Sequence, residues 1–329
     1  MNAEPHEIDV TRLPCYRTLK RADGQTWSSV LEPILRDTSG LTNKADLHLD
    51  QIDGLIAQLL DEMLRHPMPE FVIYTPPDDQ KVTPVAYLSA LVAHRAERLV
   101  QAAELAAAAL TALAQGSLQS SAVSARALFE LGVVSWDTHD KILDPWREVH
   151  GNRRKIRAEL NDPGSYVYRL LWETRMGSRF YEAEAGWPLA KSVLTRLGHL
   201  VKYVPGVRET YDMLCDTTHP NLEAQALLWR TDYITVGQNN AIRFAPGRSN
   251  SRVKLYIADA FSLSLKLVLP FARDLWWIAA DITNSCDITA TPLTDPLGLP
   301  TRTGRNDQCS CGSGSVTRTC THPEPTPVR

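Results

Sequence analysis

The strongest constraint on the fold is a long amphipathic pattern that begins near Pro84. Apolar residues recur there at steps of three and four, which is the spacing of one face of an α-helix. They are Val85, Leu88, Val92, Ala96, Leu99, Ala103, Ala106, Leu110 and Leu113. Many of these residues are alanines, which permit close approach of other helices, and Gly116 marks the predicted end. The pattern therefore predicts one long helix that packs closely against its neighbours.

Most of the remaining body has helical patterns as well. Further helices are predicted over about 47–65, 120–138, 140–160, 164–181, 187–203, 208–218 and 253–281. A proline-rich loop follows the first of them and holds one short strand at 71–74. One β-hairpin is predicted, in which strands at 233–236 and 241–244 flank the loop 237–240. We therefore expect a mainly all-α fold, an antiparallel helical bundle with one short β-hairpin.

The predicted domain organisation has five parts. Residues 1–45 have little periodicity and several turn-forming residues, so we expect an irregular N-terminal arm. The helical-bundle domain covers 46–283, and a proline-bearing linker covers 284–303. A cysteine-containing module at 304–322 and a tail at 323–329 follow.

Composition narrows the class of protein. A hydrophobic share of 43% and a charged share of 22% are typical of a globular domain. The formal net charge of −3 argues against a dedicated nucleic-acid-binding protein. The apolar stretch 261–280 is interrupted by charges and a proline, so we expect a buried helix and no membrane span. The N-terminus lacks an apolar signal core, and the body cysteines are scattered singly, which favours the cytoplasm.

The strongest chemical signal is a cluster of soft ligands near the C-terminus. Cys309, Cys311, Cys320 and His322 have the spacing Cys-x-Cys-x8-Cys-x-His. Three thiolates and one imidazole form a typical ligand set for tetrahedral structural Zn²⁺. The run Gly312-Ser313-Gly314 supplies the glycines that a sharp turn between neighbouring ligands needs. The sequence therefore predicts a zinc site in this module.

The same segment resembles a known family. The run Gly304-Arg-Asn-Asp-Gln-Cys-Ser-Cys-Gly-Ser-Gly314, followed by Cys320, is similar to the SEC-C motif. This small zinc hook is named for the C-terminus of the SecA translocation motor. The family usually has Cys or His directly after the third ligand, but this chain has Thr321, so His322 becomes the fourth candidate. The resemblance implies that the module docks on a protein partner or on the ribosome.

Polar clusters in the body give candidate sites. Arg126 and Glu130 are four residues apart on one predicted helix face. Their neighbours are nearly all apolar, which favours a buried structural ion pair over a catalytic pair. His219 precedes Pro220 at a predicted helix end, as a capping residue or, alternatively, as a general base or phosphate ligand. The basic run 150–157 is either a solvated face or a phosphate-binding surface.

These body motifs carry a second resemblance. The Ser-x-Arg-x-x-Phe-Glu helix at 124–130 and the Tyr-x-x-x-Cys-x-x-x-His-Pro turn at 211–220 are similar to a bacterial helical-bundle family of unknown function. The resemblance covers about 85–280 and implies a compact helical fold with no assigned reaction.

Two functions remain open on the sequence. The preferred one is a zinc-binding adaptor module for a macromolecular partner. The alternative is a HEPN-like ribonuclease or another defence-related enzyme, with a site around Arg126, Glu130 and His219. HEPN enzymes usually have Arg-x4–6-His within one helix. Arg196 and His199 are too close for that motif, and Arg208 and His219 are too far apart. The chain also lacks a nucleophile elbow, a phosphate-binding loop and a dinucleotide fingerprint.

Overall fold

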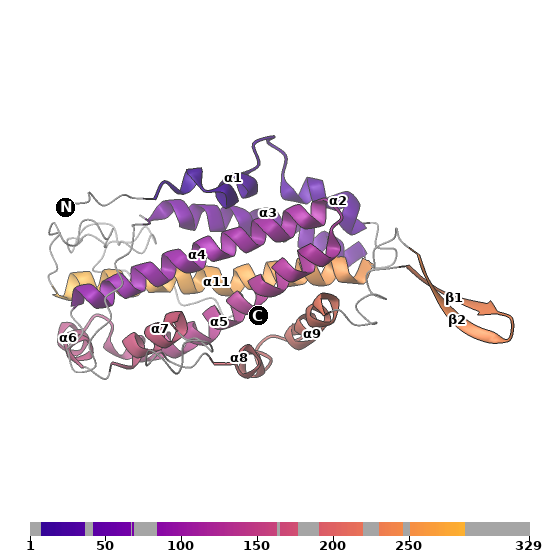
Figure 1. Ribbon diagram of the computed structural model, residues 1–329. Helices are drawn as coiled ribbons and strands as arrows, with labels where there is room; N and C mark the ends of the chain where they lie inside the picture. Colours follow the sequence, from indigo (N-terminus) through magenta and orange to yellow (C-terminus); the bar gives the residue numbers. More distant parts are fainter. Residues whose placement is uncertain are drawn as a thin grey trace, which may run out of the picture.

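The structure is a computed structural model that describes residues 8–36, 42–66, 68, 84–162, 165–176, 191–219, 230–245 and 251–286. Within these ranges the chain forms ten α-helices, one short 3-10 turn and one antiparallel pair of strands (Figure 1). The prediction of a mainly helical fold with a small hairpin is confirmed. The predicted strand at 71–74, most of the linker, the cysteine module at 304–322 and the tail lie outside the described residues.

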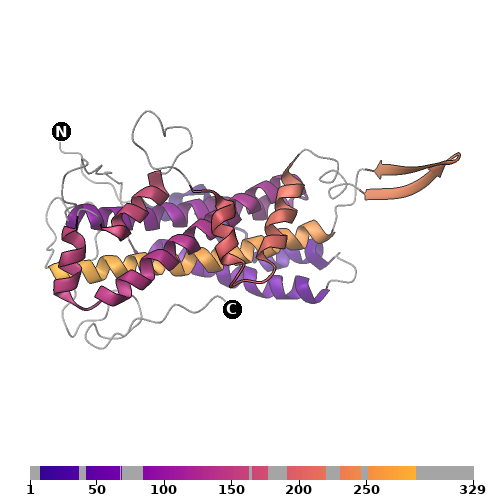
Figure 2. The same ribbon diagram turned by 90° about the horizontal axis from the view of Figure 1, so that it is seen from below.

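Four long helices form the body. They are α3 (Thr42–Arg65), α4 (Pro84–Ala114), α5 (Leu118–Val149) and α11 (Ser251–Cys286). Helix α11 lies at the centre and packs on the other three (Figures 1 and 2). Nearly all of its residues from Val253 to Ser285 are buried or half-buried, because apolar residues occur on most sides of this helix. A helix that is apolar all round is stable in water only when other helices cover it.

The directions of these helices are mixed. Three histidines of α3 and α5 contact aspartates of α11, and Glu62 of α3 contacts Arg273 of α11. Along both pairs of helices the residue numbers of the contacting partners rise together. The histidine–aspartate pairs are His48–Asp259, His139–Asp274 and His150–Asp281, with N···O distances of 2.9, 2.5 and 3.0 Å. Helices α3, α5 and α11 therefore run parallel, and only α4 runs against them. The prediction of an antiparallel bundle is right for α4 and wrong for the other three. A long connection between α5 and α11 makes the parallel arrangement possible.

The turn between α4 and α5 explains why these two helices are antiparallel. Gly116 has a φ of +74°, a conformation that glycine adopts readily. The N–H of Ser117 donates to the carbonyl of Ala112 over 2.8 Å and closes the helix end. The Ser121 hydroxyl then donates to the carbonyl of Ala109 over 2.8 Å, which joins the two helices beside the turn. The predicted end of the alanine-rich helix at 115–117 is thus confirmed.

Helices α5 and α11 approach each other closely at Gly132. A Cβ atom added at this glycine would lie 3.0 Å from the Cα of Ser264 and 3.3 Å from its carbonyl oxygen. Ordinary carbon–carbon contacts are about 3.5–4.0 Å. The absence of a side chain at position 132 therefore sets the spacing between the two helices.

The N-terminal segment is more regular than predicted. It contains α1 (Pro14–Lys20) and α2 (Trp27–Arg36), and α3 begins at Thr42. The indole N–H of Trp27 donates to the carbonyl of Leu19 over 3.0 Å, and Leu31 and Leu35 are completely buried. The expectation of an irregular arm is therefore wrong for the described part of this segment. Both helices are short and depend on packing against the body. In α2 the buried residues Trp27, Leu31 and Leu35 recur at steps of four, a helical period that the sequence analysis missed.

Helix α5 is also longer than predicted. The sequence indicated a break near 139, but α5 continues through Pro145 to Val149. Gly151, with a φ of +69°, marks the turn after it, and Asn152 caps α6 (Arg153–Asn161) by accepting from two backbone N–H groups. Asp137 lies in the part of α5 just before the predicted break. Its side chain is buried and paired with Lys141 and Arg196.

Three shorter helices cover one side of the long ones. They are α7 (Tyr166–Met176), α8 (Val193–Leu200) and α9 (Val207–Thr218). All three contact α5, and α9 also contacts α11 (Figure 2). The helices predicted at 164–181, 187–203 and 208–218 thus exist within the described residues, with shorter bounds for the first two.

The predicted hairpin is present and longer than expected. Strands β1 (Arg230–Val236) and β2 (Asn239–Ala245) pair in register from Arg230–Ala245 to Val236–Asn239. The turn contains only Gly237 and Gln238, and Gly237 has a φ of +66°. The ribbon points away from the helical body (Figures 1 and 2).

One described helix is long and apolar enough to span a membrane by length and composition. It is α11 from Val253 to Cys286, with a mean hydropathy of 1.5 in its most apolar window, and 72% of that window is buried within the molecule. Such burial is typical of a core helix.

Candidate functional site on helices α5 and α9

The structure joins two of the sequence motifs on neighbouring helices. On α5, the Nε of Arg126 lies 3.1 Å from a carboxylate oxygen of Glu130, as the spacing of four residues predicts. The Nη1 of Arg126 donates across to the hydroxyl of Thr218 on α9 over 2.9 Å. The side chains of Arg126 and Glu130 are 28% and 35% exposed. The pair is thus half-buried at the surface, and the expectation of a buried pair is wrong.

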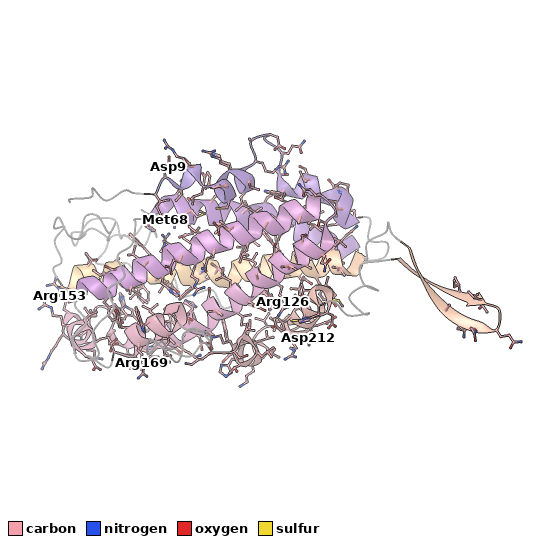
Figure 3. All side chains as sticks on the ribbon, in the orientation of Figure 1. Asp9, Met68, Arg126, Arg153, Arg169 and Asp212 are labelled. Carbon is pink, nitrogen blue, oxygen red and sulfur yellow. The ribbon has the colours of Figure 1, made fainter. Side chains whose placement is uncertain are left out.

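Helix α9 supplies a second contact from Tyr211. Its hydroxyl donates to Glu130 over 3.4 Å, and the Arg126 guanidinium lies 5.8 Å from the centre of its ring. The labelled residues Arg126 and Asp212 in Figure 3 mark this junction of α5 and α9. Every polar head in the cluster therefore has a partner on the same or the facing helix.

His219 lies at the edge of this cluster. Its backbone N–H donates to the carbonyl of Cys215 over 3.0 Å and closes the C-terminus of α9. This residue therefore occupies the predicted helix end, where its backbone does the capping. Its side chain is exposed, while Arg126 is already bonded to Glu130 and Thr218.

The protonation of the cluster is fixed by burial. Burial first, then the neighbouring Cys215 and the Glu130 charge, raise the pKa of Tyr211 to about 12. Burial likewise raises the pKa of the Cys215 thiol, and Glu130 and Asp212 add to this effect. A catalytic thiol or phenol needs a pKa near or below the working pH. Both groups are instead held protonated at neutral pH, which is the behaviour of a structural contact.

The basic run at 150–157 is largely engaged within the protein. His150 lies 3.0 Å from Asp281, and Arg153 donates to the carbonyl of Asn284 over 3.1 Å. Lys155 donates to the carbonyl of Glu148 over 3.2 Å. These contacts favour the interpretation as a structural and solvated face over a phosphate-binding surface.

The predicted zinc ligands Cys309, Cys311, Cys320 and His322 lie outside the described residues. Among the described residues, Cys15 and Cys215 are free thiols, and no three His, Cys, Asp or Glu side chains gather as a metal site. The four tail residues themselves fit Zn²⁺ by the chemistry of the donor set.

Sequence reasoning missed a charged cluster between α3, α4 and α11, in which Glu62 and Arg95 are buried and Arg273 is exposed. The Glu62 carboxylate, 1% exposed, lies 2.8 Å from the Nε of Arg273 and 3.4 Å from the Nη2 of Arg95. Arg95 also donates to the Glu62 carbonyl over 2.6 Å and lies over the Trp276 ring. Burial lowers the pKa of Arg95 to about 10. The three charged residues come from three helices, so no sequence spacing connects them.

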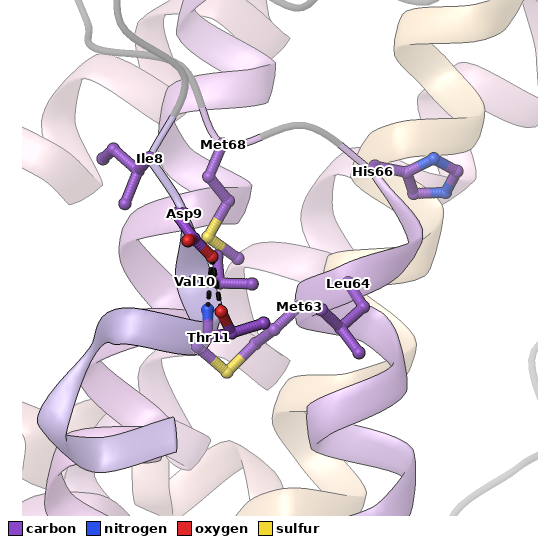
Figure 4. A pocket seen from close by; sticks show the side chains of 8 residues that line it. All are labelled: Ile8, Asp9, Val10, Thr11, Met63, Leu64, His66 and Met68. Carbon is purple, nitrogen blue, oxygen red and sulfur yellow. Dashed lines mark hydrogen bonds between the residues drawn. The ribbon is translucent and has the colours of Figure 1, made fainter. Parts of the chain in front are cut away.

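A small cavity lies beside the end of α3. Its volume is about 330 Å³, and Figure 4 shows Asp9 and Thr11 on one side with Met63 and Met68. The Asp9 carboxylate accepts from the backbone N–H and the hydroxyl of Thr11, so it caps the local turn. The His66 ring points away from the methionines in Figure 4 and stacks on Trp276 with ring centroids 3.9 Å apart. These side chains are thus occupied in local packing.

Comparison with known proteins gives no relative from which a function could be transferred. No family model, no curated protein and no solved structure matches the chain.

Proposed function

We propose that this chain is a zinc-binding adaptor, in which the helical body carries a C-terminal SEC-C-like module that docks on a macromolecular partner in the cytoplasm. The observation that carries the proposal is the set Cys309, Cys311, Cys320 and His322, together with the flanking glycines. These residues provide a complete tetrahedral ligand set for Zn²⁺ within a short segment. When bound, Zn²⁺ fixes the fold of this module. The resemblance to SEC-C modules implies a protein partner or the ribosome.

The α5–α9 cluster supports an adaptor over an enzyme. Arg126, Glu130, Tyr211 and Thr218 satisfy one another, and the raised pKa values of Tyr211 and Cys215 keep both groups protonated. This arrangement holds α9 against α5 and leaves no activated nucleophile in the cluster.

The second candidate function is the HEPN-like ribonuclease or defence-related enzyme, with a site around Arg126, Glu130 and His219. One observation favours it. The hydrogen bond from Arg126 to Thr218 places the arginine beside Thr218, which directly precedes His219. An arginine and a histidine in this proximity can bind and protonate a phosphodiester. The bonds that already engage Arg126, and the exposure of His219, count against it.

Affinity capture from native lysate tests the adaptor function. The full chain, a chain lacking 304–329 and a Cys309→Ser/Cys311→Ser double variant would be compared, with Cys215→Ser as the control. We expect one set of partners or ribosomal subunits to be retained by the full chain and by the control, and lost from the other two. Equal capture by all four proteins would contradict the role of the module. Cleavage of RNA by the full chain that His219→Ala abolishes would replace the adaptor by the enzyme.

A further inference from the structure

The β1–β2 ribbon is the least supported element of the fold. Its strands contact each other over seven residues each, and among the described elements neither has an extensive interface with a helix. Figures 1 and 2 show the ribbon extending beyond the end of the bundle. A two-stranded ribbon alone is marginally stable in water, and three or more strands are normally needed. The ribbon therefore lacks a stabilising neighbour within the described part of the chain.

Among the described elements, neither outer edge of the ribbon pairs with another strand. An unpaired edge presents a row of backbone N–H and C=O groups, and proteins usually block it with charges, prolines or bulges. The register here runs without a bulge from Arg230–Ala245 to Val236–Asn239. Charged residues occur only near the base, at Arg230, Asp232 and Arg243, and the outer part 233–242 has neither charge nor proline. The Val236 side chain at the tip is 60% exposed.

Of the two edges, β1 is better suited to pairing. It contains Thr231, Tyr233, Ile234, Thr235 and Val236, which are the β-branched and aromatic types that favour strands. Strand β2 begins with two asparagines and an alanine. The β1 edge is therefore the stronger template.

We propose that the β1 edge pairs with the β1 edge of a second copy of this chain, so that two ribbons form one antiparallel four-stranded sheet. Tyr233 is the middle residue of β1, so a two-fold axis through it brings all of both strands into register. Residues that are equally far from Tyr233 on its two sides then pair across the axis. Each ribbon gains the third strand that it lacks, and both copies gain it in the same contact. A second copy is thus an occupant that completes both ribbons at once.

Geometry and charge both favour this occupant. In the antiparallel arrangement the two ribbons point in opposite directions. The two helical bodies then lie at opposite ends of the shared edge, roughly 23 Å apart for a strand of seven residues. The two-fold axis pairs Arg230 of one copy with Val236 of the other, and Asp232 with Ile234. Like charges therefore never lie directly opposite each other, although both copies carry the same charges.

In this register, substitutions of Val236 by residues of opposite charge should have different effects on the dimer. Val236→Lys places a second cation opposite Arg230 of the other copy, whereas Val236→Glu places an anion there. Val123→Lys is the matched control, because Val123 is also exposed but lies on α5. The mass of each full-length protein would be measured by light scattering over a range of concentrations, with circular dichroism to check that the helices are retained.

We expect a dimer for the wild-type chain, for Val236→Glu and for Val123→Lys. For Val236→Lys we expect the mass to halve, or the dissociation constant to rise at least tenfold. A wild-type chain that stays monomeric at the highest concentration overturns the proposal, and so does a Val236→Lys dimer as tight as wild type. The dimer should also survive deletion of 304–329. Loss of the dimer with that segment would place the contact in the zinc module and overturn the proposal.

Discussion

The contact between Gly132 and Ser264 makes the sharpest prediction about the fold. Gly132→Ala introduces a Cβ atom 3.0 Å from the Cα of Ser264, and the backbone there cannot rotate away as a flexible side chain can. Helices α5 and α11 must move apart by several tenths of an ångström, in the most extensive helix interface of the body. Overpacking of this kind costs about 1–3 kcal/mol.

A matched variant isolates this cost from helix propensity. Replacing glycine by alanine inside a helix stabilises the helix by about 0.5–1 kcal/mol wherever the side chain fits. Gly54 of α3 is exposed, and a Cβ there would meet nothing within 4 Å. The propensity gain is common to both variants, so Gly54→Ala should be more stable than Gly132→Ala by about 1–3 kcal/mol.

Thermal unfolding followed by far-UV circular dichroism measures the difference. For a domain of this size we expect the melting temperature of Gly132→Ala to lie roughly 2–12 °C below that of Gly54→Ala. Gly132→Val should lie lower still, because it adds more volume with a smaller propensity gain than alanine. Equal melting temperatures for the two alanine variants would refute the close packing of α5 on α11.

Three further predictions follow from the same structure. Burial first, then the Arg95 and Arg65 charges, lower the pKa of His66 from 6.5 to about 3, so the folded state binds fewer protons than the unfolded state between these values. The free energy of unfolding should therefore fall as the pH drops below 6.5, by about 2 kcal/mol at pH 5. Thermal melts of His66→Phe should lack this part of the loss. An identical pH dependence in the variant and the wild type would contradict the assignment of the loss to His66. Arg126→Ala and Glu130→Ala should each lower the free energy of unfolding by about 0.5–2 kcal/mol, because the pair is half-buried and hydrogen-bonded. His219→Ala should have a melting temperature close to that of the wild type. The reverse order would mean that His219, and not the pair, stabilises this junction. Chelation of zinc should leave the helicity and the main thermal transition unchanged if the module is independent of the body, and a drop of several degrees would show that the two pack together.

Local patterns predicted the elements that depend on residues near one another in the sequence. The long helix from Pro84, its end at Gly116 and the hairpin around Gly237 follow from spacing and turn chemistry, and all are present. The Arg126–Glu130 contact follows from the same helical spacing. In each case the residues that determine the structure are close in sequence.

The features that sequence reasoning missed depend on contacts between distant segments. Helix α2 contains Pro33 and is short, yet Leu31 and Leu35 bury it in the core, and Ser28 donates its backbone N–H to Asp53 of α3. Asp137 of α5 is buried against Arg196, which reaches it from α8. The spacing of residues on α5 likewise gives no information about the partners of Arg126 on α9. No local pattern encodes such pairs.

Metal content tests the central claim most directly. The full chain, purified under reducing conditions, would be analysed for zinc by mass spectrometry beside Cys309→Ser, Cys311→Ser and the control Cys215→Ser. We expect about one zinc per chain in the wild type and in the control, as one tetrahedral site requires, and none in the two tail variants. A wild-type chain without zinc, or zinc retained at full level in a chain that ends at Gly304, would contradict the zinc-binding adaptor.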